Sequence, residues 1–546
     1  MKNLFCKRNV LGLLVALLAV VTLASCSKGV DMGAYIPNDA MVVVDVDMNE
    51  LWDKADLDNI DKISFVKLGR QELRSESPWA ADLVDAILKD PAATGLHLKR
   101  DVAVYFCYGS DIDGAAIATM HNKKKFEEFL NDFAKQNEMT VKFEDKDGWR
   151  LATMVDEINE EYYLAFNGDV AMLLFSGNGK DKVLSLKKDE SLAGDKRFRE
   201  YWKNRSEISM WMGMKEIMDI AERQGQDVRG LVGQIYGEDY WDEIEKASYA
   251  CNIVFDKGAA RMMFTVQGIS DRYIKKYMQK FNGDLVDLMP EKTYAAISVG
   301  YNLKETMKAL DSDEELGIDL DEEALDGVTI RDVVSAFGGS MLFNLFDLQV
   351  GEEGKVMPMM ALALDIKDAD IVKKLFEEIE MEPIEENVFE IGSDLFNFPI
   401  YVALNKKAVF VTNSDAALEG FKKGGNKNAM KSVAKKVKAG NYVYADLDIN
   451  HYPDGIQALL PANVKSLLGK FTDYTEFRMI DTKSGSWDFY IKDKKQNSLL
   501  ATLHFVDDNL VELGNLASEI GGSSYTDETD TGYWEDEWDE DADVHI

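Results

Sequence analysis

The chain has 546 residues, and 98 Asp and Glu against 62 Lys and Arg give it a formal net charge of -36. At roughly 100–200 residues per domain, this length predicts several domains. An apolar content of 46% is enough for packed cores and excludes a wholly disordered chain. The negative charge excludes a nucleic-acid-binding protein, because phosphate contacts need a basic surface. Four cysteines are too few for a disulfide-stabilised scaffold.

The N-terminus has the pattern of a secreted lipoprotein. Positive residues precede an apolar run of twelve at residues 10–21. A membrane-spanning helix needs about twenty residues, so this run predicts a signal peptide instead. Leu23-Ala24-Ser25-Cys26 then resembles the lipobox of bacterial lipoproteins. The resemblance implies cleavage of residues 1–25 as a signal peptide and acylation of Cys26. The alternative is an ordinary secretory signal with a chance cysteine.

An acylated Cys26 would anchor the protein to a membrane, with residues 26–34 as a lipidated tether. Several acyl chains, each contributing about 0.8 kcal/mol per buried methylene, make such an anchor effectively permanent. Ser27 follows the cysteine where Asp would favour retention in the inner membrane. By similarity to other lipoproteins, the sequence predicts a location in the cell envelope, anchored in the outer membrane. Residues 27–31 contain a single acid, so the periplasmic face and the cell surface both stay open.

Two long parts of the chain show the same order of predicted elements. A turn, a β-rich strand and an amphipathic helix follow one another at residues 36–57 and again at residues 289–310. Asn49 and Asn302 are the predicted N-caps of the two helices. Further matching pairs are a strand and helix (114–133 and 359–379), a hairpin turn (Asn167-Gly168 and Asn405-Lys406), a basic segment (196–205 and 431–438), a strand (206–214 and 441–450) and a closing hairpin with its helix (from 251 and from 488).

These matches predict an α+β fold made of two tandem repeats of antiparallel β-sheet with helices packed on one face. The predicted repeats cover residues 35–286 and 287–520. Residues 521–546 are strongly acidic and predict a disordered tail. Within this tail Tyr533, Trp534 and Trp538 are candidate docking residues for a basic partner.

Several of these features resemble one known family. They are the lipobox, the turn Ile36-Pro37-Asn38-Asp39-Ala40, the strand at residues 42–47 and the segment at residues 88–98. Together they resemble the lipoproteins of Bacteroides-type bacteria that carry domain of unknown function 4836. The resemblance implies a compartment and a fold type, and it supplies no catalytic residues.

No motif for nucleotide or metal chemistry is complete. Residues 175–182 lack the first glycine of a phosphate-binding loop, and Asp181 follows Lys180 where Ser or Thr is needed. Asp45 and Asp47 alternate like the start of a calcium loop, but Glu50 replaces its turn glycine, so a strand and a helix cap are predicted. His97, His121, His451, His504 and His545 have no zinc-ligand spacing. The sequence therefore predicts no cofactor and no metal.

Three further features allow two interpretations each. Cys107 and Cys251 fit either one disulfide or two buried thiols. The methionine-rich runs at residues 209–218 and 356–364 fit a core better than an adaptable binding surface. The two basic segments could bind lipid phosphates or an acidic partner, but neutralisation of the chain's own acids is favoured.

The sequence predicts a non-catalytic, lipid-anchored envelope protein that acts as an interaction or binding module. Its partners would be the membrane through Cys26 and an unknown envelope protein or an apolar ligand, with no nucleic acid. A carrier of an apolar ligand is the first alternative, since clefts between domains are common ligand sites. A hydrolase that uses two carboxylates is the second, but no pair stands out among 98 acids.

Overall fold

The structure is a computed structural model. It describes residues 30–514 apart from residues 77, 79–80, 83, 86–93, 109–111, 157, 178–179, 224, 231–237, 312–318, 351–355, 392–397, 449–451, 453–466 and 468.

The first half of the chain contributes ten strands to the main sheet. They are β1 (Ala40–Val46), β2 (Leu96–Tyr108), β3 (Ile112–Met120), β4 (Thr140–Lys146), β5 (Trp149–Val155), β6 (Glu161–Phe166), β7 (Val170–Leu174), β8 (Ile208–Gly213), β9 (Ser248–Asp256) and β10 (Ala259–Gln267). The helices between them are η1 (Met32–Tyr35), α2 (Met48–Ala55), η2 (Leu57–Lys62), α3 (Ser64–Glu76), α5 (Lys123–Gln136), α6 (Lys180–Leu184), η4 (Lys188–Glu190), η5 (Leu192–Gly194), α7 (Lys196–Lys203), α8 (Met214–Arg223), α10 (Glu238–Ile244) and α11 (Asp271–Tyr277).

The second half contributes the other ten strands of the main sheet. They are β11 (Ala295–Gly300), β14 (Phe337–Val350), β15 (Val356–Ile366), β16 (Glu382–Glu385), β17 (Val388–Ile391), β18 (Ile400–Leu404), β19 (Ala408–Thr412), β20 (Val443–Leu447), β21 (Thr472–Met479) and β22 (Ser484–Ile491). β12 (Glu323–Leu325) and β13 (Val328–Thr329) form a separate pair. The helices are η6 (Gly283–Leu288), α12 (Leu303–Asp311), α13 (Ile330–Ser335), α14 (Ala369–Glu378), α15 (Asp415–Lys422), α16 (Ala434–Val437) and α19 (Ser498–Asp508).

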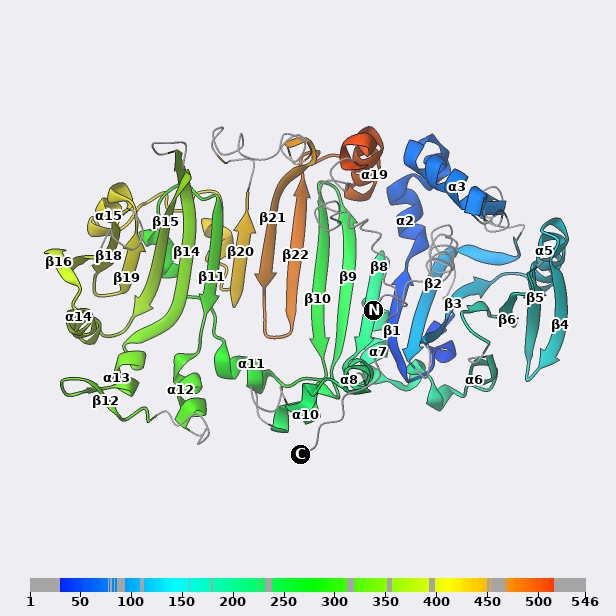
Figure 1. Ribbon diagram of the computed structural model, residues 1–546, viewed down its shortest axis with the longest axis horizontal. Coiled ribbons are helices and arrows are strands. Elements are labelled where there is room, and N and C mark those ends of the chain that lie inside the picture. Colours follow the sequence, from blue (N-terminus) through cyan, green and yellow to red (C-terminus); the bar gives the residue numbers. More distant parts are fainter. Residues whose placement is uncertain are drawn as a thin grey trace, which may run out of the picture.

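Within the described residues, these twenty strands form one antiparallel sheet, and the pair β12 and β13 stands apart from it. The hydrogen-bonded order is β4-β5-β6-β7-β3-β2-β1-β8-β9-β10, then β22-β21-β20-β11-β14-β15-β19-β18-β17-β16. β10 pairs with β22 in the middle of the sheet, where Met262 lies opposite Trp487 (Figure 1). Segments about 220 residues apart in the sequence are therefore neighbours. The mixed helix and strand content and the antiparallel pairing agree with the predicted α+β class.

The sheet has two faces, because successive side chains of a strand point to opposite sides and directly paired residues point to the same side. We call them the Trp211 face and the Trp487 face, after the tryptophans on β8 and β22. Val43, Tyr105 and Ala250 lie on the Trp211 face, since each is linked to Trp211 by direct pairing in the sheet.

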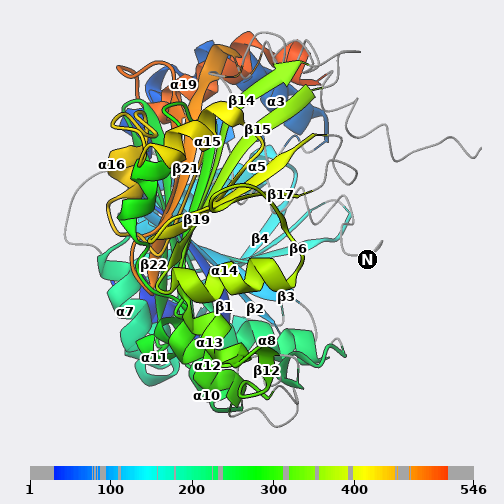
Figure 2. The ribbon, with the colours of Figure 1, turned by 90° about the vertical axis from the view of Figure 1, so that its left-hand side faces the viewer.

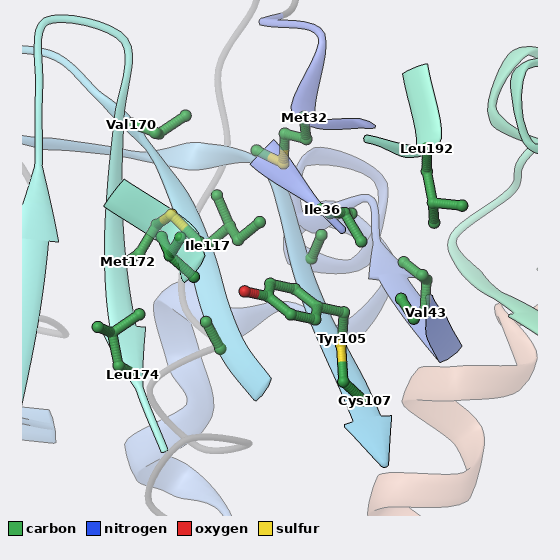
Figure 3. Close-up of a cluster of buried hydrophobic side chains, with 14 of the residues drawn as sticks. Met32, Ile36, Val43, Tyr105, Cys107, Ile117, Val170, Met172, Leu174 and Leu192 are labelled. Atoms are coloured by element: carbon green, nitrogen blue, oxygen red, sulfur yellow. The ribbon is translucent and has the colours of Figure 1, made fainter. Parts of the chain in front are cut away.

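Helices contribute to the core on both faces. Phe198 and Tyr201 of α7 are buried in the same cluster as Tyr105 and Trp211, on the Trp211 face. Figure 3 shows the part of this cluster around Tyr105. On the Trp487 face, α2 packs on β1 and β2, α5 packs on β5 to β7, and α14 packs on β17 to β19. Figure 2 shows α7 and α16 on one side of the sheet and α14 on the other. This differs from the prediction of helices on one face. Strands such as β2 carry apolar residues on both sides, so both sides need cover.

Local turn chemistry fixes several connections. Asn167 accepts hydrogen bonds from the backbone N–H groups of Asp169 and Val170 in the β6–β7 turn, and Asn405 plays the same part in the β18–β19 turn. Both hairpins were predicted. Asn302 caps α12 as predicted, because its side chain accepts from the Glu305 N–H. The prediction for α2 is wrong: Asp47, not Asn49, is the N-cap, because its carboxylate reaches two N–H groups of the first turn.

In the described part of the chain, no helix combines the length and the apolar composition needed to cross a membrane.

Candidate binding face and the polar row behind it

The middle of the Trp487 face carries three rows of uncharged side chains across neighbouring strands. Within each row, every residue lies directly opposite the next. The rows are Met210-Cys251-Phe264-Gly485-Met479-Val443-Val299-Met341-Leu364, Ile208-Ile253-Met262-Trp487-Phe477-Ala445-Ile297-Phe343-Leu362, and Phe255-Ala260-Phe489-Thr475-Leu447-Ala295-Leu345-Met360. We call these residues the open face. Thr475 is the only hydroxyl-bearing member of the three rows.

Large apolar side chains in the middle of the open face are exposed to solvent. Trp487 is 42% exposed, Phe489 36%, Ile297 44% and Leu447 37%. The Trp487 indole N–H donates to the Thr475 hydroxyl at 2.7 Å, and the Trp487 and Phe489 ring centroids are 4.9 Å apart. The one polar atom of the indole is therefore satisfied inside the surface, which leaves an apolar exterior.

A pocket of about 500 Å³ lies at one end of this surface, where α19 meets the ends of β21 and β22. Phe471 and Phe505 line it, and their rings stack with centroids 4.6 Å apart. Ile491 also lines it and lies two residues beyond Phe489 on the same face of β22. The pocket is thus an extension of the open face. Lys470, His504 and Asp508 add polar groups to its wall.

The opposite side of the same strands is polar and buried. Asp446, Glu476 and Asp488 lie directly opposite one another on β20, β21 and β22, and they are 7%, 1% and 0% exposed. Arg478 places its Nη2 2.7 Å from the Asp488 carboxylate and its Nε 3.2 Å from that of Glu476. Lys436, on α16, forms a second ion pair with Glu476. We call these five residues the polar row.

The polar row has two cations for three carboxylates. Burial raises the pKa of Asp446 to about 7, although the Lys436 ammonium opposes the rise. The rings of Tyr474 and Tyr490 stack at 4.1 Å beside the row, with Lys436 4.5 Å from the Tyr474 ring centroid. Burial also raises the pKa of Tyr474 to about 12. The acids are closely spaced, but all three are buried, and Glu476 and Asp488 are bound by counter-ions, so the polar row offers no accessible acid–base pair.

The first half has a smaller buried ion group on the Trp211 face. Asp45 is fully buried and pairs with Arg205 at 2.8 Å, and Arg205 also pairs with Asp101. Burial raises the pKa of Asp45 despite the guanidinium. The alternating acids Asp45 and Asp47 thus belong to a strand and to a helix cap, as predicted: Asp45 forms an ion pair, and Asp47 caps α2.

Both basic segments form ion pairs with acids of this chain. In addition to Arg205, Arg197 pairs with Asp195 at 2.6 Å, and Lys438 pairs with Asp287 at 2.6 Å. These contacts agree with the predicted neutralisation. The methionines of the two methionine-rich runs lie in two environments. Met359 is buried in a core, whereas Met210 and Met360 are half-buried on the open face. The core prediction is therefore wrong for part of each run, because successive residues of a strand face opposite sides.

Cys107 and Cys251 are both free thiols. Cys107 lies on the Trp211 face and Cys251 on the Trp487 face, so the sheet itself separates them. Burial raises the pKa of both thiols, that of Cys107 to about 12. Cys26, Tyr533, Trp534 and Trp538 lie outside the described residues, as do His451 and His545.

The strand pairing brings together two histidines that are 24 residues apart. His121 Nδ1 is 3.1 Å from His97 Nε2, because β2 and β3 are neighbours. Sequence spacing gave no sign of this pair. The pocket residue His504 was likewise not singled out. Its Nδ1 is 3.2 Å from the side-chain amide of Gln496. Among the residues described, no group of three His, Cys, Asp or Glu side chains could hold a metal ion.

Comparison with known proteins identifies a family and no further relative. The sequence model of the family described as Domain of unknown function (DUF4836) matches residues 33–499. No curated protein matches the chain. No solved structure matches it. The family match confirms the resemblance seen in the turn and strand at residues 36–47.

Proposed function

Since the chain belongs to the family of Domain of unknown function (DUF4836), which carries no assigned activity, we propose a function from its geometry. The protein is a non-catalytic binding module of the cell envelope, and its open face holds an apolar ligand. This proposal joins the binding-module and ligand-carrier hypotheses that the sequence raised.

A single observation carries the proposal: strands β20 to β22 expose apolar side chains on one side and bury charged side chains on the other. Exposed apolar patches larger than a few hundred Å² are rare on soluble proteins and mark sites of binding. The three rows of the open face cross nine strands and contain no charged residue. Ile208 and Phe255 pack against the cluster of α2, and Leu364 packs against that of α14, so the exposed part lies between these two ends. Exposed aromatic and methionine side chains suit a ligand that is apolar and variable in shape.

The lipobox supports a permanent attachment of this module to a membrane. In the proposal, Cys26 is acylated in the outer membrane, and residues 26–34 tether the folded part near the lipid surface. The acidic tail with Tyr533, Trp534 and Trp538 remains a proposed docking segment for an envelope protein. An apolar ligand and a nearby membrane are chemically consistent, because the membrane is both a source and a destination for such a ligand.

We also propose that the chain consists of two tandem repeats, at residues 35–286 and 287–520. The order of strand pairing supports this: β1 lies between β2 and β8, and β11 lies between β14 and β20. The same correspondence continues to β4 and β16 at the two outer ends. The open face would then span the junction of the repeats.

Native purification followed by lipid extraction and mass spectrometry tests the function. We expect an apolar or amphipathic molecule at close to one equivalent per chain. Ile297→Asp places a charge on the open face and should reduce the recovered ligand at least fivefold. Ile384→Asp is the matched control, since Ile384 is 47% exposed on the outer strand β16. The proposal would be contradicted if the unaltered protein carried no ligand, or if the Ile297→Asp and Ile384→Asp proteins lost equal amounts of ligand.

A further inference from the structure

We infer that the ligand is a phospholipid with a zwitterionic headgroup, and that the pocket between α19 and the ends of β21 and β22 binds this headgroup. The inference rests on the proposed function and adds the ligand class and its orientation. The acyl chains would lie along the open face, and the phosphate and ammonium groups would lie in the pocket.

The orientation follows from where the pocket lies. Phe489 belongs to the open face, and Ile491, two residues further along the same face of β22, lines the pocket. A ligand that starts in the pocket can therefore continue onto apolar surface without crossing a charged residue. The pocket volume of about 500 Å³ holds a polar headgroup but not two long acyl chains.

The aromatic wall and one carboxylate suit an ammonium group. Phe471 and Phe505 present a stacked pair of rings, and aromatic rings attract quaternary or primary ammonium groups. Asp508 lines the same pocket, and no described residue forms an ion pair with it. Asp493 is used differently, because its carboxylate accepts hydrogen bonds from the N–H groups of Lys495 and Gln496 in a turn. Asp508 is thus the carboxylate left for a cation.

A cation in the same wall suits the phosphate. Lys470 Nζ is 2.9 Å from the Asn509 side-chain oxygen and 3.2 Å from the Glu512 carboxylate, and these contacts hold it at the pocket. One lysine and one unpaired carboxylate in one pocket complement a headgroup that carries both charges. A headgroup that carries only the phosphate charge could use Lys470 but would leave Asp508 without a cation.

Binding of short-chain lipids tests the inference. The full chain with Cys26→Ala, which removes the predicted acylation site, is titrated by calorimetry with dihexanoylphosphatidylcholine and dihexanoylphosphatidylglycerol below their micelle concentrations. We expect the choline lipid to bind about tenfold more tightly. Asp508→Asn should reduce this preference to within twofold, because it removes the carboxylate that faces the ammonium. Glu128→Gln, on the exposed surface of α5, is the matched control and should keep the preference.

Trp487→Ala separates this inference from the proposed function. It should weaken the binding of both lipids, because the acyl chains contact the open face regardless of the headgroup. If Trp487→Ala weakens both lipids but Asp508→Asn leaves the choline preference intact, the proposed function stands and the headgroup inference is overturned. Equal affinity of the unaltered chain for the two lipids would overturn it as well. If neither lipid binds and native protein also carries none, both proposals fail.

Discussion

Trp211 on β8 and Trp487 on β22 stand on opposite faces of one sheet, and their surroundings differ completely. Trp211 is buried under α7, where its ring meets that of Phe198 edge-on at 5.5 Å. Trp487 is exposed, with Phe489 and Thr475 beside it. On the Trp487 side the sheet exposes apolar residues, and on the Trp211 side it buries charged ones. This arrangement costs free energy on both sides, which is why we attribute it to binding rather than to folding.

Substitution of the two tryptophans should give the largest difference in stability between the two faces. Trp211→Ala should lower the free energy of unfolding by about 4 kcal/mol, because it empties a large volume in a packed core. Trp487→Ala should lower it by less than about 1 kcal/mol, because the indole is already half in water. Urea denaturation of both variants measures the difference. Similar losses for the two would mean that the open face is covered in the folded protein.

The polar row predicts the next largest effect. Arg478→Met should lower the free energy of unfolding by about 3 kcal/mol, because Asp488 would remain buried without its cation. Arg331→Met removes two surface ion pairs, with Asp311 and with Asp321, and should change stability little. The same denaturation assay compares the two. A loss below about 1 kcal/mol for Arg478→Met would show that Asp488 is neutral or hydrated.

A pH dependence follows from Asp446. Its pKa of about 7 in the folded protein lies above the ordinary value of 3.8 for an Asp side chain, so the folded state binds more protons than the unfolded chain between these values. Stability should therefore fall as pH rises from about 4 to 7. Asp446→Asn should remove this slope. The difference in free energy of unfolding between the variant and the unaltered protein should therefore shift by about 2 kcal/mol in favour of the variant between pH 5 and pH 8. If the free energy of unfolding changed with pH in the same way in both proteins, the raised pKa of Asp446 would be contradicted.

The smallest effect concerns Thr475. Thr475→Val keeps the shape of the side chain but removes the hydroxyl that accepts from the Trp487 indole. The substitution also removes the hydrogen bond that this hydroxyl donates to the Asp488 carbonyl at 3.2 Å, and the two losses together should cost about 1 kcal/mol in the denaturation assay. Thr502→Val, which removes a hydroxyl within α19 that donates to the Ser498 carbonyl at 2.7 Å, is a comparison of similar size. A loss of several kcal/mol for Thr475→Val would show that the indole N–H is inaccessible to water.

The sequence predicted the local features well and the long-range ones poorly. The turns at Asn167 and Asn405 were predictable, because a short polar side chain and its own backbone form them. The predicted N-cap of α2 was two residues away from the observed one. Asp47 and Asn49 are both good caps, and only the position where the strand ends decides between them. The pairing of β10 with β22 had no local signal at all.

The open face could not be predicted for a related reason. A strand such as β15 is apolar on both sides, so alternation did not distinguish a covered face from an exposed one. The polar row was also hidden, because Asp446, Glu476 and Asp488 belong to three strands and only the register puts them side by side. The class of the fold follows from residue patterns, whereas the site follows from the alignment of distant strands.

The two outer strands of the sheet affect how the protein behaves at high local concentration. β4 and β16 each pair on one side only among the described residues, so their other sides could recruit further strands. β4 carries Lys142, Glu144 and Lys146, and β16 contains Pro383, which cannot donate a backbone hydrogen bond. Crowded copies are thereby kept from polymerising edge to edge, and the sheet ends within one molecule.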